Sequence, residues 1–252
     1  LISFISRIDT NRSEASFCDN FKDFVVSINP AFFSNNYLKS ALSFLLSLEN
    51  IDHFCLFPSF SFLYLKDLSS DYKVHKSQLI DNNNYCFLCD GLFLTALKKM
   101  IFQDACWEIL FKKLRKDIAY KVSCEDYFLN ELQLNFFIAL GQQCFLNEYV
   151  YHLDDIESVF INKIIDKCNN VEIKESFLVV LSCYAPLYKF LDRVEKIDVF
   201  SSNNHEFQDL IRIQIKEPLS ELELSTSIEK RGVIKNIISN KVKEQYEENP
   251  YP

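Results

Sequence analysis

The apolar residues of this chain recur at the spacing of an α-helix along nearly its whole length, and this repeat constrains the fold more than any other feature. In residues 34–50, Leu38, Leu42 and Leu45 fall on one stripe, and Ser34 precedes them as a suitable N-cap. The pattern predicts an all-α fold, an array or bundle of helices with short connections that ends in an extended, proline-containing linker.

The same period predicts most of the remaining helices. They are expected in residues 13–30, 85–103, 104–122, 125–149, 153–168, 173–185, 205–217, 218–232 and 239–248. Ser123 and Asp126 predict a variant capping box for the helix of residues 125–149. That helix would bury one face, made of Phe128, Leu132, Phe136, Leu140 and Cys144.

Other local signals set the expected boundaries. The helix of residues 205–217 should end before Pro218, and Ile156, Phe160, Ile164 and Ile165 should point inward from the helix of residues 153–168. Pro58 and serine-rich turns interrupt residues 55–80, where we expect short helices and loop.

The asparagine-rich break at residues 81–84 suggests a division into parts. We expect a helical layer in residues 1–80, in which degenerate helical repeats would fit, a main bundle in 81–238, and a helix with a linker in 239–252. Because the chain begins at Leu1 inside an apolar pattern, we also expect it to be truncated at its front.

Glycine is scarce, with three residues in the chain. Loops that hold phosphates or dinucleotides need glycine where the backbone approaches the ligand, and no such motif occurs. We therefore expect no catalytic residue, no cofactor-binding residue and no self-contained S-adenosylmethionine site in this segment.

The net charge of −8 argues against general binding of nucleic acid. A local basic zone is the exception, and it is either a solvated helix face or a docking patch for an acidic partner. Its members are Lys98, Lys99, Lys112, Lys113, Arg115 and Lys116.

Cysteine use indicates reduced thiols in a cytoplasmic protein, since the nine cysteines are scattered and no signal peptide or long apolar run accompanies them. We expect no membrane segment and no metal site. Cys86 and Cys89 form a CxxC pair, which is read as core packing in preference to a metal or redox site because no second ligand pair completes it.

The stretch QQCFLNEYVY, residues 142–151, mixes buried and polar character. On a helix, Gln143, Asn147 and Glu148 would form a polar face beside Tyr149 and its aromatic neighbours. Such a face would line a groove or order a loop; the alternative is an ordinary helix C-terminus.

Four sequence blocks, in this order along the chain, carry a resemblance to a known family. They are QCFLNEYVY, VLSCYAPLYKF, LIRIQIKEPLSELELSTSI and VKEQYEENPYP. Together, over residues 130–252, they resemble the middle region of a family of bacterial S-adenosylmethionine-dependent methyltransferases that often carry tetratricopeptide repeats.

In that family the last block precedes an Arg-Trp pair and the Rossmann-like catalytic core. The resemblance implies that Tyr246, Glu247, Asn249 and Tyr251 dock onto such a core, with Pro250 and Pro252 stiffening the connector. It also implies that the catalytic domain lies outside this chain, that S-adenosylmethionine is the cofactor of the full-length protein, and that the helical region recognises the substrate.

The sequence leaves three candidate functions. The first is the non-catalytic recognition region of a methyltransferase, whose partners are its own catalytic domain and a substrate, with a protein favoured over a small molecule. The second is a freestanding helical protein-interaction module without enzymatic activity. An enzyme active on this chain alone is the third, and the missing glycine loop argues against it.

Overall fold

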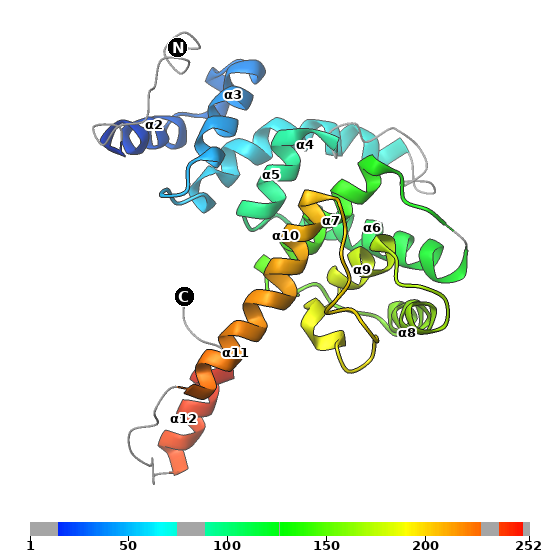
Figure 1. Cartoon of the computed structure of the whole chain (residues 1–252). Helices are drawn as coiled ribbons and strands as arrows, with labels where there is room; N and C mark the ends of the chain where they lie inside the picture. Colours follow the sequence, from blue (N-terminus) through cyan, green and yellow to red (C-terminus); the bar gives the residue numbers. More distant parts are fainter. Residues whose placement is uncertain (1–14, 75–88, 126, 228–236, 249–252) are drawn as a thin grey trace. The chain divides into compact units, whose positions relative to one another are not determined.

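The computed structural model describes residues 15–74, 89–125, 127–227 and 237–248 (Figure 1). Every regular element in these residues is a helix, so the predicted all-α fold is confirmed. The chain divides into two compact units, Leu1–Glu217 and Pro218–Pro252. The boundaries expected near residues 80 and 238 stay predictions, since the break at 81–84 lies outside the described residues.

The first unit contains both α-helices and shorter helical turns. Its α-helices are α2 (Ala15–Ser27), α3 (Asn35–Ser47), α4 (Phe57–Val74), α5 (Gly91–Lys99), α6 (Ala105–Cys124), α7 (Glu131–Leu146), α8 (Asp155–Asn170), α9 (Glu175–Ser182) and α10 (His205–Ile211). Shorter turns are the 3₁₀ segments η2 (Pro30–Phe32), η3 (Phe54–Leu56) and η5 (Leu187–Phe190), and the π-helical turn η6 (Arg212–Lys216).

Side-chain caps explain where several helices begin. Ser34 Oγ accepts from Tyr37 N at 3.3 Å, as the sequence predicts, and Asp90 Oδ1 accepts from Leu92 N at 2.9 Å at the start of α5. Asp154 begins α8 with a complete capping box. These caps satisfy backbone donors that have no partner within the helix.

The predicted capping box at Ser123 is wrong. Helix α6 continues through Ser123, whose Oγ donates to Tyr120 O at 3.0 Å, and α7 begins after Asn130, which forms a capping box with Gln133. Asp126 lies outside the described residues. The later start leaves Phe128 and Leu132 exposed, whereas Phe136, Leu140 and Cys144 are buried as expected.

Residues 57–74 form one continuous helix, so the expected short helices and loop are wrong there. Pro58 is its second residue, where a backbone N–H has no intrahelical partner to lose. The aromatic residues of this helix pack into a cluster, in which Phe60 and Phe93 lie 5.7 Å apart and Phe93 and Trp107 lie 5.4 Å apart between ring centroids. Burial of these rings outweighs the local turn signals.

Two further expectations are wrong. The helical run that begins with α10 does not stop before Pro218, because η6 and then α11 (Glu217–Ser227) follow α10 directly. The π-helical turn carries a bond from Glu217 N to Arg212 O, and Pro218 falls in the first turn of α11, where proline is tolerated. Ile156 is 56% exposed because the buried stripe of α8 begins at its neighbour Glu157 and continues through Ile164 and Ile165.

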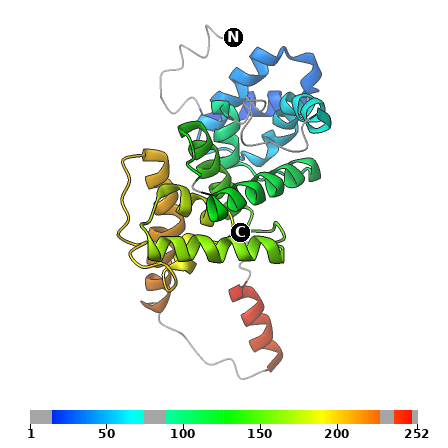
Figure 2. The ribbon, with the colours of Figure 1, turned by 90° about the vertical axis from the view of Figure 1, so that its right-hand side faces the viewer.

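Helix α7 is the centre of the first unit. It packs against α5, α9 and α10, while α6 packs along α8 (Figures 1 and 2). All residues from Phe136 to Cys144 are buried, which is typical of a helix surrounded by others. Within the described residues, no helix is long and apolar enough to cross a membrane.

The second unit contains the rest of α11 and α12 (Ile237–Glu248). Helix α12 agrees with the helix predicted for residues 239–248. The proline-containing linker expected after it lies outside the described residues, as does Gly232, where the preceding helix was expected to end.

Gly141 allows α7 and α9 to approach closely, and its replacement tests this packing. A Cβ at position 141 would lie 2.2 Å from Ser182 Oγ and 3.2 Å from Ser182 Cβ, so we expect Gly141→Ala to lower the free energy of unfolding by about 1–3 kcal/mol in chemical denaturation. Adding Ser182→Ala removes the shorter contact and should restore part of the loss.

Gly91→Ala is the matched control. No heavy atom lies within 4 Å of a Cβ built at Gly91, so we expect this variant to retain or slightly raise stability. Equal losses at both glycines would contradict the close-packing explanation.

Candidate functional site

The block of residues 142–151 does not form the expected polar helix face. Helix α7 ends at Leu146, and Asn147 is its C-cap residue. Glu148 and Tyr149 then adopt left-handed backbone conformations, with φ of 56° and 57°. The chain therefore leaves the helix in a tight turn that separates the four predicted residues, in agreement with the alternative of a helix C-terminus.

Gln143 is fully buried against the end of α5. In the amide orientation that satisfies the neighbouring carbonyls, with its oxygen and nitrogen exchanged, Gln143 Nε2 donates to Met100 O at 2.7 Å and to Leu97 O at 3.2 Å. These carbonyls belong to the C-terminal part of α5, where helices lack internal partners. Gln143 thus joins two helices and does not line a groove.

The three other residues of the block differ in exposure. Glu148 is exposed, Asn147 is buried, and Tyr149 is half-buried and donates from Oη to Ser182 O at 3.2 Å. Asn147 Oδ1 and the nearby Tyr151 Oη make no hydrogen bond with the described residues. Burial raises the pKa of Tyr149, so its phenol remains a neutral donor.

Ser182 O is the point where distant parts of the sequence meet. Besides Tyr149, it accepts from Gln214 Nε2 at 3.4 Å, and the same amide donates to Gly141 O at 2.8 Å. Gln214 Oε1 accepts from Leu187 N at 3.3 Å. Gln214 is fully buried in the π-helical turn, so α7, α9 and η6 are joined at one junction.

Gln214 was not among the candidate site residues predicted from the sequence. Its only signal is a polar residue between Ile213 and Ile215, in a segment whose apolar residues predict a buried stripe. The π-helical turn moves this side chain onto the buried face, and such a turn cannot be inferred from a regular period.

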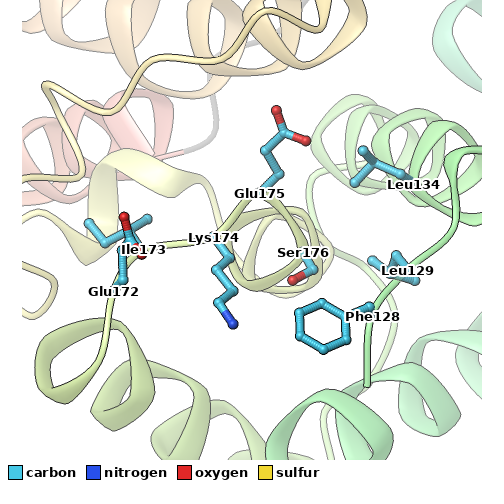
Figure 3. Close-up of a pocket in the computed structure, with 8 residues that line it drawn as sticks. All are labelled: Phe128, Leu129, Leu134, Glu172, Ile173, Lys174, Glu175 and Ser176. Carbon is cyan, nitrogen blue, oxygen red and sulfur yellow. The ribbon is translucent and has the colours of Figure 1, made fainter. Parts of the chain in front are cut away.

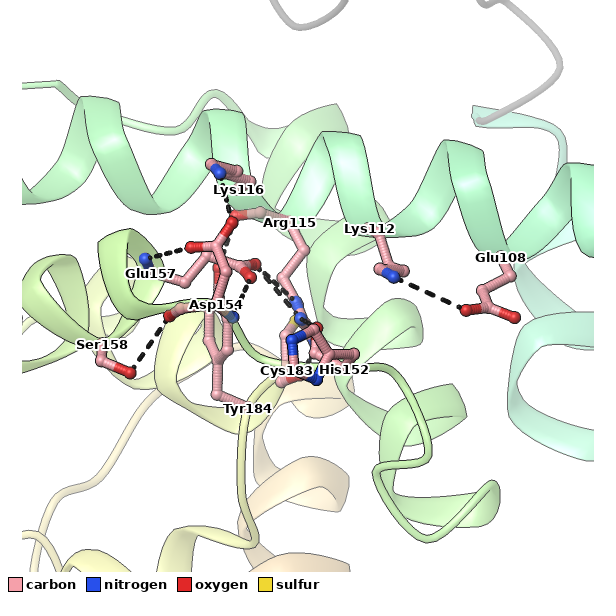
Figure 4. Close-up of polar contacts among 10 residues, drawn as sticks. All are labelled: Glu108, Lys112, Arg115, Lys116, His152, Asp154, Glu157, Ser158, Cys183 and Tyr184. Carbon is pink, nitrogen blue, oxygen red and sulfur yellow. Dashed lines mark hydrogen bonds and ion pairs between the residues drawn. The ribbon is translucent and has the colours of Figure 1, made fainter.

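A second polar centre is the buried ion pair of Arg115 and Glu157 (Figure 4). Arg115 and Glu157 are 1% and 3% exposed. Arg115 Nε and Nη2 donate to Glu157 Oε1 at 3.2 and 3.1 Å. The guanidinium also donates to His152 O at 3.0 Å and to Cys183 O at 3.4 Å, so it ties α6 to α8, α9 and the turn before α8.

Tyr184 and Asp154 complete this centre. Tyr184 Oη lies 3.1 Å from both Glu157 Oε1 and Arg115 O, and its ring lies 4.3 Å from the guanidinium carbon. Asp154 N donates to Glu157 Oε2 at 3.1 Å, so Glu157 serves the capping box and the ion pair together. Lys116 pairs with Asp154 at its edge.

These contacts also divide the basic zone. Arg115 is buried in the ion pair, Lys98 pairs with Glu206, and Lys99 Nζ donates to Leu46 O at 2.7 Å. Lys112 lies 3.7 Å from Glu108. The zone is therefore not a single solvated helix face, because its members lie on α5 and α6 and Arg115 is buried, while a docking role for its lysines stays a prediction.

The buried thiols and phenols are poor nucleophiles. Burial raises the pKa of Cys183 well above its usual value and that of Cys168 to about 12, and it also raises the pKa of Tyr184. These groups stay protonated at neutral pH, so they pack and donate hydrogen bonds. In the part of the chain that the structure describes, no group of His, Cys, Asp and Glu side chains is arranged to hold a metal ion. Cys86 lies outside that part, whereas Cys89 is exposed, so the expected packing of this pair in the core is wrong at Cys89.

A surface pocket of about 340 Å³ lies at the N-terminus of α9 (Figure 3). The segments before α7 and α9 and the first residues of both helices line it. The lining residues are Phe128, Leu129, Leu134, Glu172, Ile173, Lys174, Glu175 and Ser176. Phe128 was expected on the buried face of the helix of residues 125–149, so the helical period gave no indication of a pocket at its exposed ring.

The remaining predicted residues lie at the end of the chain. Tyr246 and Glu247 belong to α12 in the second unit, whereas Asn249 and Tyr251 lie outside the described residues. Their expected docking onto a catalytic core stays a prediction.

The fold thus defines an all-α helical array with two buried polar junctions and a surface pocket on α9. Comparisons with protein-family models, with curated proteins and with solved structures find no match to this chain.

The buried ion pair is tested by removing one partner. We expect Arg115→Met to lower the free energy of unfolding by about 3–5 kcal/mol, because the Glu157 carboxylate would stay buried without its cation. Arg115→Met combined with Glu157→Leu should recover most of this loss, as measured by urea denaturation.

Lys112→Met is the control, because Lys112 forms a more exposed ion pair of the same helix. We expect Lys112→Met to change the free energy of unfolding by less than about 1 kcal/mol. A double variant as unstable as Arg115→Met alone would mean that the pair itself, and not the uncompensated charge, supplies the stability.

Proposed function

We propose that this chain is the non-catalytic helical recognition region of a bacterial S-adenosylmethionine-dependent methyltransferase. A catalytic core outside these residues transfers the methyl group, and S-adenosylmethionine binds to that core. The chain acts in the cytoplasm and binds the substrate, with a protein as the favoured acceptor.

The observation that carries the proposal is the meeting of three of the resembling blocks at one junction. Tyr149 comes from the first block, Ser182 from the second and Gln214 from the third, and side-chain hydrogen bonds join them at Ser182 O. Blocks that resemble one family and also pack as one unit support a common origin better than scattered similarities do.

The chemistry of the described residues agrees with a recognition role. Raised pKa values keep the buried thiol of Cys183 and the phenol of Tyr184 protonated, and Arg115 is fully engaged in the ion pair. Methyl transfer depends mainly on holding the acceptor against the activated methyl group. In this proposal the helical array holds the acceptor and the core supplies the cofactor.

A freestanding helical interaction module is the second candidate. The surface pocket on α9 favours it, because a pocket with an exposed aromatic ring can bind a protein partner without any attached enzyme. The coding sequence after Pro252 distinguishes the two: an open frame that continues into Arg-Trp and a glycine-rich loop supports the methyltransferase, whereas a stop codon supports the module.

In a polypeptide that includes the catalytic core, we expect Tyr246→Ala with Tyr251→Ala to lower the methyl-transfer rate about tenfold or more, which corresponds to ~1.4 kcal/mol of lost positioning. The 252-residue chain alone should show no saturable binding of S-adenosylmethionine in calorimetry.

Phe32→Ala serves as the control, since Phe32 is 83% exposed on the first unit and should leave the rate unchanged. An unaltered rate in the double tyrosine variant would contradict the docking role. Saturable binding of the cofactor by the 252-residue chain would contradict the recognition-only role.

A further inference from the structure

The pocket on α9 holds a cation over an exposed aromatic ring. Phe128 is 69% exposed, and Lys174 Nζ lies 4.8 Å from the centroid of its ring and 5.7 Å from that of Phe177. Figure 3 shows Lys174 between Glu172 and Phe128, with the Glu175 carboxylate pointing away from the ammonium. The ring face of Phe128 therefore already attracts a positive charge, supplied by the chain itself.

The charges around the pocket decide which ligand fits. Lys174 and the N-terminus of α9 contribute about one and a half positive charges, and Glu172 and Glu175 contribute two negative ones. Glu175 stands in the first turn of α9, where its acid suits the helix dipole, and it accepts a hydrogen bond from Ser202 Oγ. The positive end of the helix is thus balanced within the chain, and the net charge of −8 also favours a basic partner.

We infer that this pocket binds a basic side chain, arginine or lysine, of a protein partner, and that this side chain takes the place of Lys174 on the ring of Phe128. The inference deepens the recognition part of the proposed function and rests on it only in that the chain binds a protein. Attachment to a methyltransferase core is not needed.

The walls of the pocket suit such a side chain. Leu129, Leu134 and Ile173 are partly buried and apolar, so they can cover the aliphatic part of arginine or lysine. Phe128 supplies the aromatic face for the charged head, and Glu172 supplies a carboxylate in the same lining. Arginine should bind more tightly than lysine, because its planar guanidinium stacks on a ring and pairs with a carboxylate at the same time.

Replacing Lys174 tests the inference, because the resulting change in peptide affinity differs between a pocket that binds a cation and one that binds an anion. The probe is a short fluorescein-labelled glycine–serine peptide that carries arginine, and fluorescence anisotropy with the 252-residue chain measures its Kd. If Lys174 competes for the ring, Lys174→Met should lower the Kd about two- to fivefold. If the pocket instead bound an anion, a matched glutamate-containing peptide would bind in place of the arginine peptide, and the same variant would raise the Kd of that glutamate peptide.

Changes to the ring and the carboxylate complete the experiment. Phe128→Leu keeps an apolar contact but removes the ring and should raise the Kd about two- to fivefold, as should Glu172→Gln. Phe32→Ala, another exposed aromatic residue, should leave the Kd unchanged. Lys174, Phe128 and Glu172 are exposed or half-buried, so we expect their variants to fold. Circular dichroism of each variant checks its helix content.

The outcomes separate this inference from the proposed function. Saturable binding of the arginine peptide, tightened by Lys174→Met and weakened by Phe128→Leu, supports the pocket even if the chain never joins a methyltransferase core. Absence of binding at millimolar peptide, a preference for a glutamate-containing peptide, or weaker binding by Lys174→Met would overturn it, and none of these bears on the test with Tyr246 and Tyr251.

Discussion

The buried ion pair of Arg115 and Glu157 is the interaction on which the first unit depends. Desolvating two charges costs several kcal/mol for each, so the pair is tolerable only because its remaining donors and acceptors are satisfied. The guanidinium reaches His152 O and Cys183 O, and the carboxylate also accepts from Asp154 N. Arg115 lies on α6, and these partners lie at the end of α9 and at the start of α8, so the satisfied pair ties these three helices together.

The C-terminus of α9 joins this ion pair to the second junction. Its last carbonyls lack partners within the helix, and side chains from elsewhere supply them: Cys183 O accepts from Arg115, while Ser182 O accepts from Tyr149 and Gln214. The close approach of α7 at Gly141 brings these groups within reach. Helix α9 is short, and its position is therefore determined by side chains from three other elements.

Local signals predicted the parts of this structure that depend on neighbouring residues. The cap at Ser34 and the buried stripe of α3 follow from a few adjacent positions, and both are confirmed. The choice of Asn130 over Ser123 as a cap was not predictable, because burial of Val122 and Ser123 extends α6 beyond its local signal. Arg115 was grouped with surface lysines, since a charge pattern does not reveal a carboxylate that is 42 residues away in sequence. The turn at Glu148 and Tyr149 was missed for the same reason: its left-handed backbone is held by contacts with α9 that sequence spacing does not show.

The pocket lies on the same helix as both buried junctions, and this affects how much the protein must rearrange when a ligand binds. It opens at the N-terminus of α9, and the C-terminus of the same helix is held by Arg115, Tyr149 and Gln214. A binding site on a helix held in this way needs little rearrangement to receive a ligand, and the ordering cost of binding is correspondingly small. The residue that must move is Lys174, whose flexible side chain can leave the ring without disturbing the backbone. Recognition would then be an exchange of one cation for another on a fixed aromatic surface, with selectivity set by Phe128 and Glu172 and rigidity set by the buried ion pair.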